Sequence, residues 1–217
     1  MADFTLHCFA ESGNAYKAAL MLELCGADWE PHRVAFFTGE TRGPEFRDLN
    51  EMGEVPVLID HTRRPDLVLS QSGAILYHLG EHYGKFMPES EEEKREALRW
   101  ILWDNHKLTS YSATYRFLRL FAGKGDTAEA QFFFARAQSA WKVLNGHLQD
   151  RDWVAADRPT IADFSLCGYL FWPAQIGMIT DEYPNIPRWL DRIRGLHGFK
   201  LPEDLMPSGQ EQDTATA

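Results

Sequence analysis

The sequence predicts an α+β fold, with a mixed four-stranded sheet domain followed by an all-helical domain. Up to about residue 83 the apolar residues occur in short runs broken by glycine and proline, a pattern typical of alternating strands and helices. From about residue 93 they recur at spacings of three and four, the period of amphipathic helices. The acidic, proline-containing stretch between the two patterns predicts residues 1–83 as one domain, 84–92 as a linker, 93–201 as a helical bundle and 202–217 as a polar tail.

Each element of the first domain has its own local signal. A helical stripe over residues 15–25 ends at Gly26, a residue typical of helix C-termini. Residues 38–50 predict a loop with at most a short helix, and another helix starts near Ala74. Strands are expected within Phe4–Phe9, Trp29–Phe37, Val55–Asp60 and Asp66–Leu69. The first two strands then form a parallel βαβ unit and the last two an antiparallel hairpin, so the sheet is mixed.

The second domain is predicted from four apolar stripes at helical spacing. Carboxylates near Glu91 precede the first stripe, where they favour the positive end of a helix dipole. The stripes comprise Leu98, Ile101 and Leu102; Phe133, Ala137, Trp141, Leu144 and Leu148; Phe164, Cys167, Phe171 and Ala174; and Ile186, Leu190 and Ile193.

Composition narrows the function classes. Lys and Arg number 22 against 32 Asp and Glu, a formal charge of −10 that disfavours nucleic acid and anionic membrane surfaces as partners. The chain lacks an apolar run of bilayer length and a signal-peptide start, and its three separated cysteines suit a reducing compartment. The eight histidines are interpreted as scattered, without metal-ligand spacing. We therefore expect a cytoplasmic protein with small-molecule partners and no metal.

Three junctions between strands and helices are candidates for binding. A cis bond at Val55-Pro56 would turn the Val55 backbone toward a cleft, although an isolated Val-Pro favours a trans proline at a strand start. The segment Ser70–Gly73 offers side-chain donors and helix N-terminal N–H groups for a carboxylate, and a plain helix cap explains it equally well. The segment Ser12–Asn14 by itself favours a capped turn. Thr160–Asp163 predicts a capping box with a purely structural role.

Taken in order, these segments resemble the glutathione transferase family over roughly residues 4–200. None is diagnostic alone, but five in this order across a β-rich and a helical half are specific. The matched segments are Ser12–Lys17, Gly39–Phe46, Leu49–Leu58, Ser70–Tyr77 and Thr160–Phe164. The Ser-Gly-Asn turn is most similar to bacterial cytosolic members. The resemblance implies a thioredoxin-like N-terminal domain, an all-α helical-bundle C-terminal domain, a homodimer and a role in detoxification.

The resemblance also implies glutathione as cosubstrate and a role for each matched position. Val55, before a cis Pro56, would pair its backbone with the cysteinyl part of glutathione. Gln71 and Ser72 would hold the γ-glutamyl end.

For catalysis, the resemblance implies that Ser12 hydrogen-bonds the glutathione sulfur, with Asn14 as a second candidate donor. A free thiol with a pKa of about 8.5 is only a few per cent thiolate at neutral pH. One or two charge-assisted hydrogen bonds of about 1.5–3 kcal/mol each would make the thiolate dominant. The thiolate would then attack a small hydrophobic electrophile, and peroxidase activity stays open.

Some residues depart from the family pattern. Glu54 stands before Val55, where an acid would not attract a doubly carboxylated ligand, so it is expected to weaken glutathione binding. Gln71 replaces the acid of many members, and no proline follows Asn50. Cys8 lies within the first strand and is interpreted as a core residue, which disfavours disulfide reductase chemistry based on a protein cysteine.

A second pocket for the electrophile is expected in the helical half. Tyr111 and Tyr115 are one helical turn apart and can face a cleft together, and packing at a domain or subunit interface explains them equally well. The leading hypothesis is a glutathione transferase. The alternative is a non-catalytic protein of the same fold that binds hydrophobic ligands or a protein partner, and isomerase or dehalogenase work by the same thiolate is a weaker third.

Overall fold

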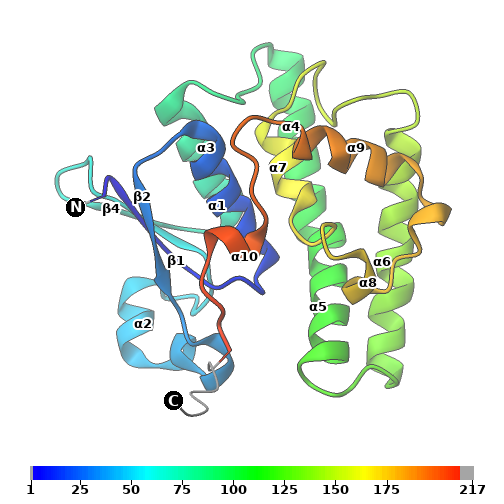
Figure 1. Cartoon of the computed structure of the whole chain (residues 1–217), viewed down its shortest axis with the longest axis horizontal. Helices are drawn as coiled ribbons and strands as arrows, with labels where there is room; N and C mark the ends of the chain where they lie inside the picture. Colours follow the sequence, from blue (N-terminus) through cyan, green and yellow to red (C-terminus); the bar gives the residue numbers. More distant parts are fainter. Residues whose placement is uncertain (1, 211–217) are drawn as a thin grey trace. The chain divides into compact units, whose positions relative to one another are not determined.

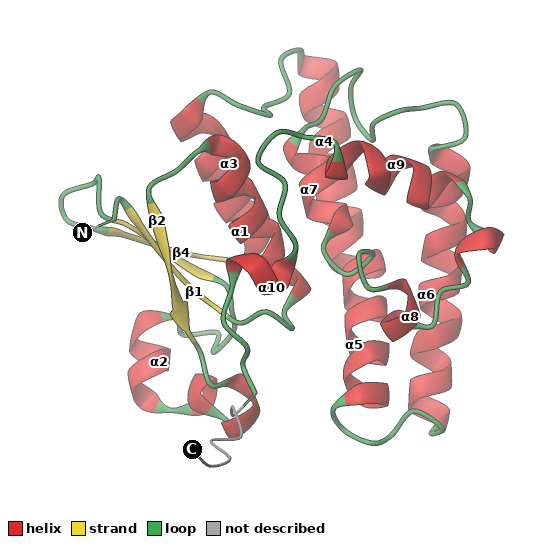
Figure 2. Cartoon of the chain, viewed as in Figure 1, coloured by secondary structure: helices red, strands yellow, loops and turns green. Residues whose placement is uncertain are grey.

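The computed structural model describes residues 2–210, which fall into two compact units (Figure 1). Of the described residues, 2–83 and 197–210 form the first unit, and Gly84–Leu196 form the second. The first unit contains the sheet, and the second is helical (Figure 2). The predicted fold class is therefore confirmed. One boundary differs from the expectation, because residues 197–201 group with the first unit rather than with the helical one.

The sheet contains four strands among the described residues: β1 (Phe4–Cys8), β2 (Trp29–Arg33), β3 (Val57–Asp60) and β4 (Leu67–Ser70), in the order β2-β1-β3-β4. Strand β1 runs parallel to β2 and antiparallel to β3, which pairs antiparallel with β4. The predicted mixed sheet is confirmed. Strand β2 is shorter than expected, because the chain turns into the 3₁₀ segments η1 (Phe36–Thr38) and η2 (Glu40–Arg42).

Successive side chains of β1 point to opposite faces of the sheet, and different helices cover the two faces. Phe4, Leu6 and Cys8 are buried, and α1 (Gly13–Cys25) packs beside α3 (Ser72–Tyr83) on their side of the sheet. His7 points to the opposite face, where its ring lies 6.5 Å from that of Phe46 on the short helix α2 (Pro44–Leu49). The expected first helix ends at Gly26, whose φ of +74° suits the left-handed turn there.

The second unit is built from antiparallel and crossing helices, of which α5 (Thr109–Leu120) packs along α6 (Ala128–His147) (Figure 1). Ser90 caps α4 (Glu91–Trp103) through the N–H of Glu93, and glutamates occupy the first turn as expected. The helical segments are α4 (Glu91–Trp103), the π-helical turn η3 (Asp104–Leu108), α5 (Thr109–Leu120), α6 (Ala128–His147), α7 (Ile161–Cys167), α8 (Pro173–Ile176), the 3₁₀ turn η4 (Thr180–Glu182) and α9 (Asn185–Arg194).

Packing covers the predicted stripes to different degrees. Ala137, Trp141 and Leu144 of α6 are fully buried. The stripe that opens α4 is helical as predicted, but Leu98 and Leu102 are 57% and 62% exposed. Periodicity identifies an apolar face but does not say what covers it.

The capping box of α7 is the polar centre of the helical unit. Thr160 and Asp163 bond reciprocally, as the sequence predicts, and Asp163 is fully buried. Its carboxylate also accepts hydrogen bonds from the N–H of Val154 and the indole N–H of Trp189, both at 2.9 Å. One aspartate thus joins the start of α7 to a preceding loop and to α9.

The predicted polar tail from residue 202 contains a structured segment. Helix α10 (Pro202–Leu205) packs against α1, and Leu205 and Met206 are buried. Residues 211–217 of that predicted tail lie outside the described residues. The apolar side chains of α10 explain the difference, because a mostly polar segment still packs where two or three apolar groups can be covered.

Candidate functional site

The register of the sheet brings three loops to one edge of the first unit. His7 lies opposite Val57, and Val57 lies opposite Ser70. The end of β1, the start of β3 and the end of β4 therefore lie side by side. The predicted site residues lie on the loops that join the sheet at this edge and on the first helical turns that follow them; these residues are Ser12, Asn14, Val55, Pro56, Gln71 and Ser72.

Ser12 is the N-cap of α1 and is 5% exposed. Its Oγ accepts a hydrogen bond of 3.1 Å from the N–H of Ala15. A hydroxyl that accepts in this way keeps its own proton for donation. Asn14 follows in the first turn, and its Oδ1 is buried without a hydrogen-bond partner among the described residues. Both residues thus retain hydrogen-bonding capacity at the start of α1.

The peptide bond between Val55 and Pro56 is cis, as the family resemblance implies. Val55 is half-buried, whereas Pro56 is buried at the entrance to β3. This geometry places the backbone of Val55 in the loop immediately before the strand, at the edge described above.

The loop before Val55, in which no proline follows Asn50, is shaped by Asn50 and Gly53. The Asn50 amide donates to the carbonyl of Glu54 at 2.8 Å, and its oxygen accepts from the N–H of Met52 at 3.2 Å. Gly53 has a φ of +65°, and a Cβ there would lie 2.8 Å from the carbonyl oxygen of Thr41. Only glycine fits this turn without a shift of the backbone.

Gln71 adopts a left-handed backbone conformation between β4 and α3, with a φ of +69°. Such a conformation is uncommon for a residue with a Cβ and occurs often at functional sites. Its exposed amide donates to Glu54 Oε2 at 3.2 Å. Ser72 is buried as the first residue of α3. The structure thus joins Glu54 and Gln71, two residues that the sequence analysis treated as separate departures.

The C-terminal segment lies against the loop that leads to Ser12. The N–H of Ala10 donates to the carbonyl of Pro207 at 2.8 Å, and Glu11 accepts from Ser208 Oγ at 2.6 Å and from Gly209 N–H at 2.9 Å. A Cβ on Gly209 would lie 2.9 Å from the Phe9 side chain, so glycine permits this close approach. Sequence reasoning missed this contact, because no local pattern links residues nearly 200 positions apart.

The cysteines are placed as structural residues. Cys8, Cys25 and Cys167 are all free and buried. Burial raises the pKa of the Cys8 thiol to about 12. Such a thiol carries almost no thiolate at neutral pH, so the interpretation of Cys8 as a core residue is confirmed.

In the helical unit, Tyr111 and Tyr115 both lie on α5. Tyr115 is 8% exposed and its ring lies 4.6 Å from that of Phe134 on α6. Tyr111 is half-buried, and its hydroxyl accepts from Lys107 Nζ at 3.3 Å. A shared role of the two tyrosines in a substrate pocket stays a prediction.

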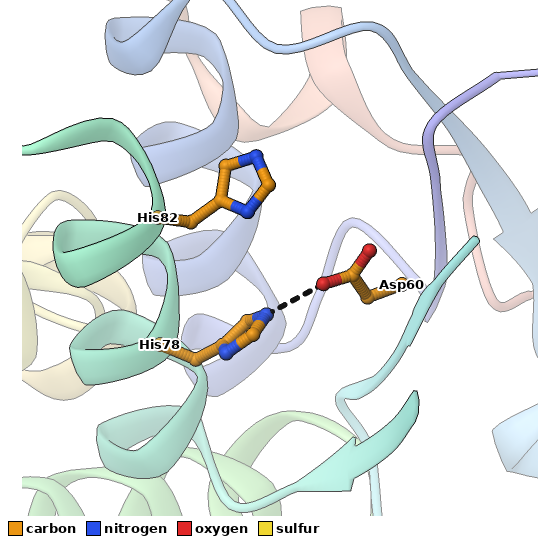
Figure 3. A group of neighbouring side chains, drawn as sticks. All are labelled: Asp60, His78 and His82. Carbon is orange, nitrogen blue, oxygen red and sulfur yellow. Dashed lines mark hydrogen bonds and ion pairs between the residues drawn. The ribbon is translucent and has the colours of Figure 1, made fainter. Parts of the chain in front are cut away.

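One cluster of potential metal ligands was not predicted from the sequence. His78 and His82 are four residues apart on α3, so the interpretation of the histidines as lacking ligand spacing is wrong for this pair. Both rings project toward Asp60 at the end of β3 (Figure 3). The His-x-x-x-His spacing was a visible signal, whereas the contribution of Asp60 depends on the position of β3 beside α3.

Comparison with known proteins matches both units to domains of one protein family. The family model of the glutathione S-transferase N-terminal domain matches residues 2–81, and that of the C-terminal domain matches residues 116–196. The chain is 26% identical over 190 residues to disulfide-bond oxidoreductase YfcG of Escherichia coli K12, covering 86% of this chain and 88% of that protein.

Two solved structures are also similar to this chain in their three-dimensional fold. A possible glutathione S-transferase from Rhodopseudomonas palustris has a TM-score of 0.86 and 30% identity, covering 93% of this chain and 98% of the other. A glutathione transferase family member from Pseudomonas fluorescens with two glutathione molecules bound has a TM-score of 0.79 and 25% identity, covering 94% and 92%. No helix among residues 2–210 combines the length and apolar character needed to cross a bilayer. Fold, sheet-edge geometry and relatives agree, and the chain belongs to the glutathione S-transferase family.

Proposed function

We propose that this protein binds reduced glutathione at the sheet edge of its first unit and activates its thiol as a thiolate, which attacks small hydrophobic electrophiles and so joins the whole glutathionyl group to them. The observation that carries this proposal is the register of β1, β3 and β4, which gathers Ser12, Val55 and Gln71 at one edge. The Pseudomonas fluorescens structural neighbour with two bound glutathione molecules supports the same ligand. Activity as a homodimer is part of this proposal, and the exposed Leu98 and Leu102 of α4 support it as apolar surface available to a second copy.

Ser12 and Asn14 are the proposed donors to the glutathione sulfur. The Ser12 hydroxyl proton is available because its oxygen acts as acceptor in the helix cap. A donor aimed at sulfur stabilises the thiolate, and each unit by which the thiol pKa falls corresponds to about 1.36 kcal/mol. The serine acts as a donor and forms no covalent intermediate.

The contact between Gln71 and Glu54 suggests how the γ-glutamyl end is held. That end of glutathione carries an ammonium group as well as a carboxylate. Gln71 replaces the acid of many family members, and Glu54 Oε2 lies 3.2 Å from the Gln71 amide nitrogen. We infer that Glu54 supplies the missing negative charge to the ammonium, while Gln71 and Ser72 donate to the carboxylate.

The first test is calorimetric titration of the purified protein with reduced glutathione near neutral pH. We expect saturable binding of one molecule per chain, weakened at least tenfold by Gln71→Ala and unchanged in the exposed control Gln149→Ala. The Glu54→Gln variant should bind glutathione more weakly, whereas the sequence alone predicts the opposite sign. Absence of saturation at millimolar glutathione, confirmed by a second method, would favour the non-catalytic alternative.

The role of Ser12 needs a control for helix capping. Ser12→Ala should lower transferase turnover at least tenfold, which corresponds to about 1.4 kcal/mol. It also removes the cap of α1, at a cost of about 1 kcal/mol of stability. Ser90→Ala removes a cap of the same geometry from α4, with 3.1 Å between Oγ and the N3 N–H in both helices. The Ser90→Ala control should keep full activity. Ser12→Thr, which returns a hydroxyl to position 12, should recover the turnover that Ser12→Ala loses. An unchanged rate in Ser12→Ala would transfer the role to Asn14.

A second candidate activity is disulfide exchange, favoured by the name of the YfcG relative. With Cys8, Cys25 and Cys167 all buried, the attacking sulfur would belong to glutathione. Its thiolate would form a mixed disulfide with one substrate sulfur and release the other as a thiolate. A second glutathione would resolve the mixed disulfide, giving glutathione disulfide and the reduced substrate. Parallel assays with an aryl halide, a hydroperoxide and a small disulfide distinguish the two activities.

A further inference from the structure

The strongest cluster outside the proposed glutathione site lies at the opposite end of the same two elements. Asp60 is the last residue of β3, whereas His78 and His82 occupy the second half of α3. The two histidines are one helical turn apart and project from one face of α3 toward the Asp60 carboxylate (Figure 3). One ligand atom from each of the three residues lies within 4.8 Å of the others.

The carboxylate of Asp60 is held in place before any ion arrives. The side chain is fully buried, and its Oδ1 accepts from the N–H of Thr62 at 2.9 Å and from the Thr62 hydroxyl at 2.6 Å. Its Oδ2 faces His78 Nε2 at 2.8 Å, and the exposed Arg63 lies 3.6 Å away. One oxygen is therefore fixed by Thr62, while the other faces His78 and lies 3.6 Å from Arg63 Nε. Such hydrogen bonding of a ligating carboxylate is typical of metal sites.

The donor set is the one that zinc prefers. Two imidazole nitrogens and one carboxylate oxygen form a common three-ligand set, which leaves a fourth position for water. Zinc–ligand bonds of about 2.0–2.2 Å place tetrahedral ligand atoms about 3.3–3.6 Å apart. The pair Asp60–His78 is already closer than this, so the ion would separate these two atoms slightly and draw in His82 by side-chain rotation.

We propose that Asp60, His78 and His82 form a binding site for a divalent transition-metal ion of the zinc type. The ion joins the end of β3 to the C-terminal half of α3. It thereby clamps the two elements whose other ends carry the residues proposed to bind glutathione. The ion acts as a structural brace and takes no part in thiol chemistry, so the site stands independently of the proposed function.

A simple hydrogen bond between sheet and helix is the competing explanation, and His82 decides between them. A structural pair of Asp60 and His78 is complete with two residues. His82 instead packs its ring at 5.3 Å from Phe4 and 4.7 Å from Tyr83. If the cluster serves only packing, the chain will bind no zinc here, and replacing the His82 imidazole will not change any zinc binding that occurs elsewhere.

The experiment is titration of the full chain, free of any affinity tag, with Zn²⁺ in the absence of glutathione, whose thiol binds zinc. We expect one zinc per chain, with His82→Gln weakening the affinity at least tenfold. Co²⁺ in place of zinc should give the visible absorption of a tetrahedral site with nitrogen and oxygen ligands, lost in the same variant. His106→Gln, which removes an exposed histidine from the helical unit, is the matched control.

A second control addresses the other histidine pair of the first unit. The rings of His7 and His32 lie 4.3 Å apart beside a surface cavity of about 390 Å³ that Glu40 also lines. His32→Gln should leave zinc affinity unchanged. If His32→Gln removes binding, if His82→Gln does not weaken it, or if the wild type binds no zinc at 100-fold molar excess, the proposal is wrong. Should His82→Gln fail to fold, as judged by circular dichroism, Asp60→Asn and His78→Gln carry the same test.

Discussion

Asp60 in the sheet unit and Asp163 in the helical unit are both fully buried, yet their surroundings differ in kind. Asp163 accepts hydrogen bonds from neutral groups that lie inside one helical unit, namely two backbone N–H groups, a hydroxyl and an indole. Asp60 faces ionisable groups, with His78 at 2.8 Å and Arg63 at 3.6 Å. Burial alone therefore does not define the role of a carboxylate. The neighbours decide whether it anchors a fold or is available to a ligand.

The pKa values of the two carboxyls move in opposite directions. For Asp163, burial raises the pKa and its neutral donors do not fully compensate. For Asp60, burial also acts upward, but the hydrogen bonds from Thr62 and His78 outweigh it and lower the pKa. At neutral pH Asp60 is thus a stable anion, as a metal ligand must be.

The largest effect is expected from Asp163→Ala. This change leaves the N–H groups of Val154, Thr160 and Trp189 buried without an acceptor, and each such loss costs about 1–3 kcal/mol. We expect the free energy of unfolding to fall by about 3–5 kcal/mol in denaturant titration. Asp191→Ala, which removes an exposed ion pair with Arg194, should change it by less than about 1 kcal/mol. Equal effects of the two substitutions would show that the buried network is not an anchor.

Zinc should stabilise the protein through the Asp60 cluster and not through the surroundings of Asp163. Free zinc at 100 times its dissociation constant should stabilise the wild type by about 2.7 kcal/mol, measured as a shift of the unfolding transition. Asp60→Asn should remove most of this stabilisation, whereas Asp191→Ala should retain it. Retention of the full zinc response in Asp60→Asn would exclude Asp60 as a ligand.

The acid limb of the stability profile tests the lowered pKa of Asp60. A carboxyl with a lowered folded-state pKa contributes stability above its unfolded pKa of about 3.9 and loses it as the pH falls through the folded value. Wild-type stability should therefore decrease more steeply than that of Asp60→Asn as the pH falls from 5 to 3. Urea titrations across that range should show the larger loss of stability in the wild type. Parallel profiles would contradict the assigned direction.

The two aspartates also show how far sequence reasoning reaches. The box around Asp163 was predictable because Thr160 and Asp163 are three residues apart, a spacing that the first helical turn itself imposes. The Asp60 cluster was not predicted, because a strand residue meets His78 and His82 only through the placement of β3 beside α3. The exposure of Leu98 and Leu102 was not predictable for a related reason, since helical periodicity does not reveal whether a neighbour covers the stripe.

Some features of the candidate glutathione site were likewise predictable from the sequence, and others were not. The segments at Ser12, Val55 and Gln71 were predictable as an ordered set of motifs, and the cis bond before Pro56 agrees with that expectation. The left-handed backbone of Gln71 and its contact with Glu54 were not, because they depend on how two loops meet at the edge of the sheet.

The smallest effect is expected from Thr62→Val, which removes one donor to Asp60 and preserves the shape of the side chain. Thr62 is exposed, so water can replace its hydroxyl, and we expect a loss of only about 0.5 kcal/mol. Thr160→Val removes the hydroxyl from the fully buried box, where water has no access, and should cost about 1–2 kcal/mol. The denaturant midpoints of the two variants measure the cost of losing the same hydroxyl group at an exposed position and at a buried one. If Thr62→Val proves the more costly, the Asp60 carboxylate depends on Thr62 for its position, and that variant should then also lose zinc affinity.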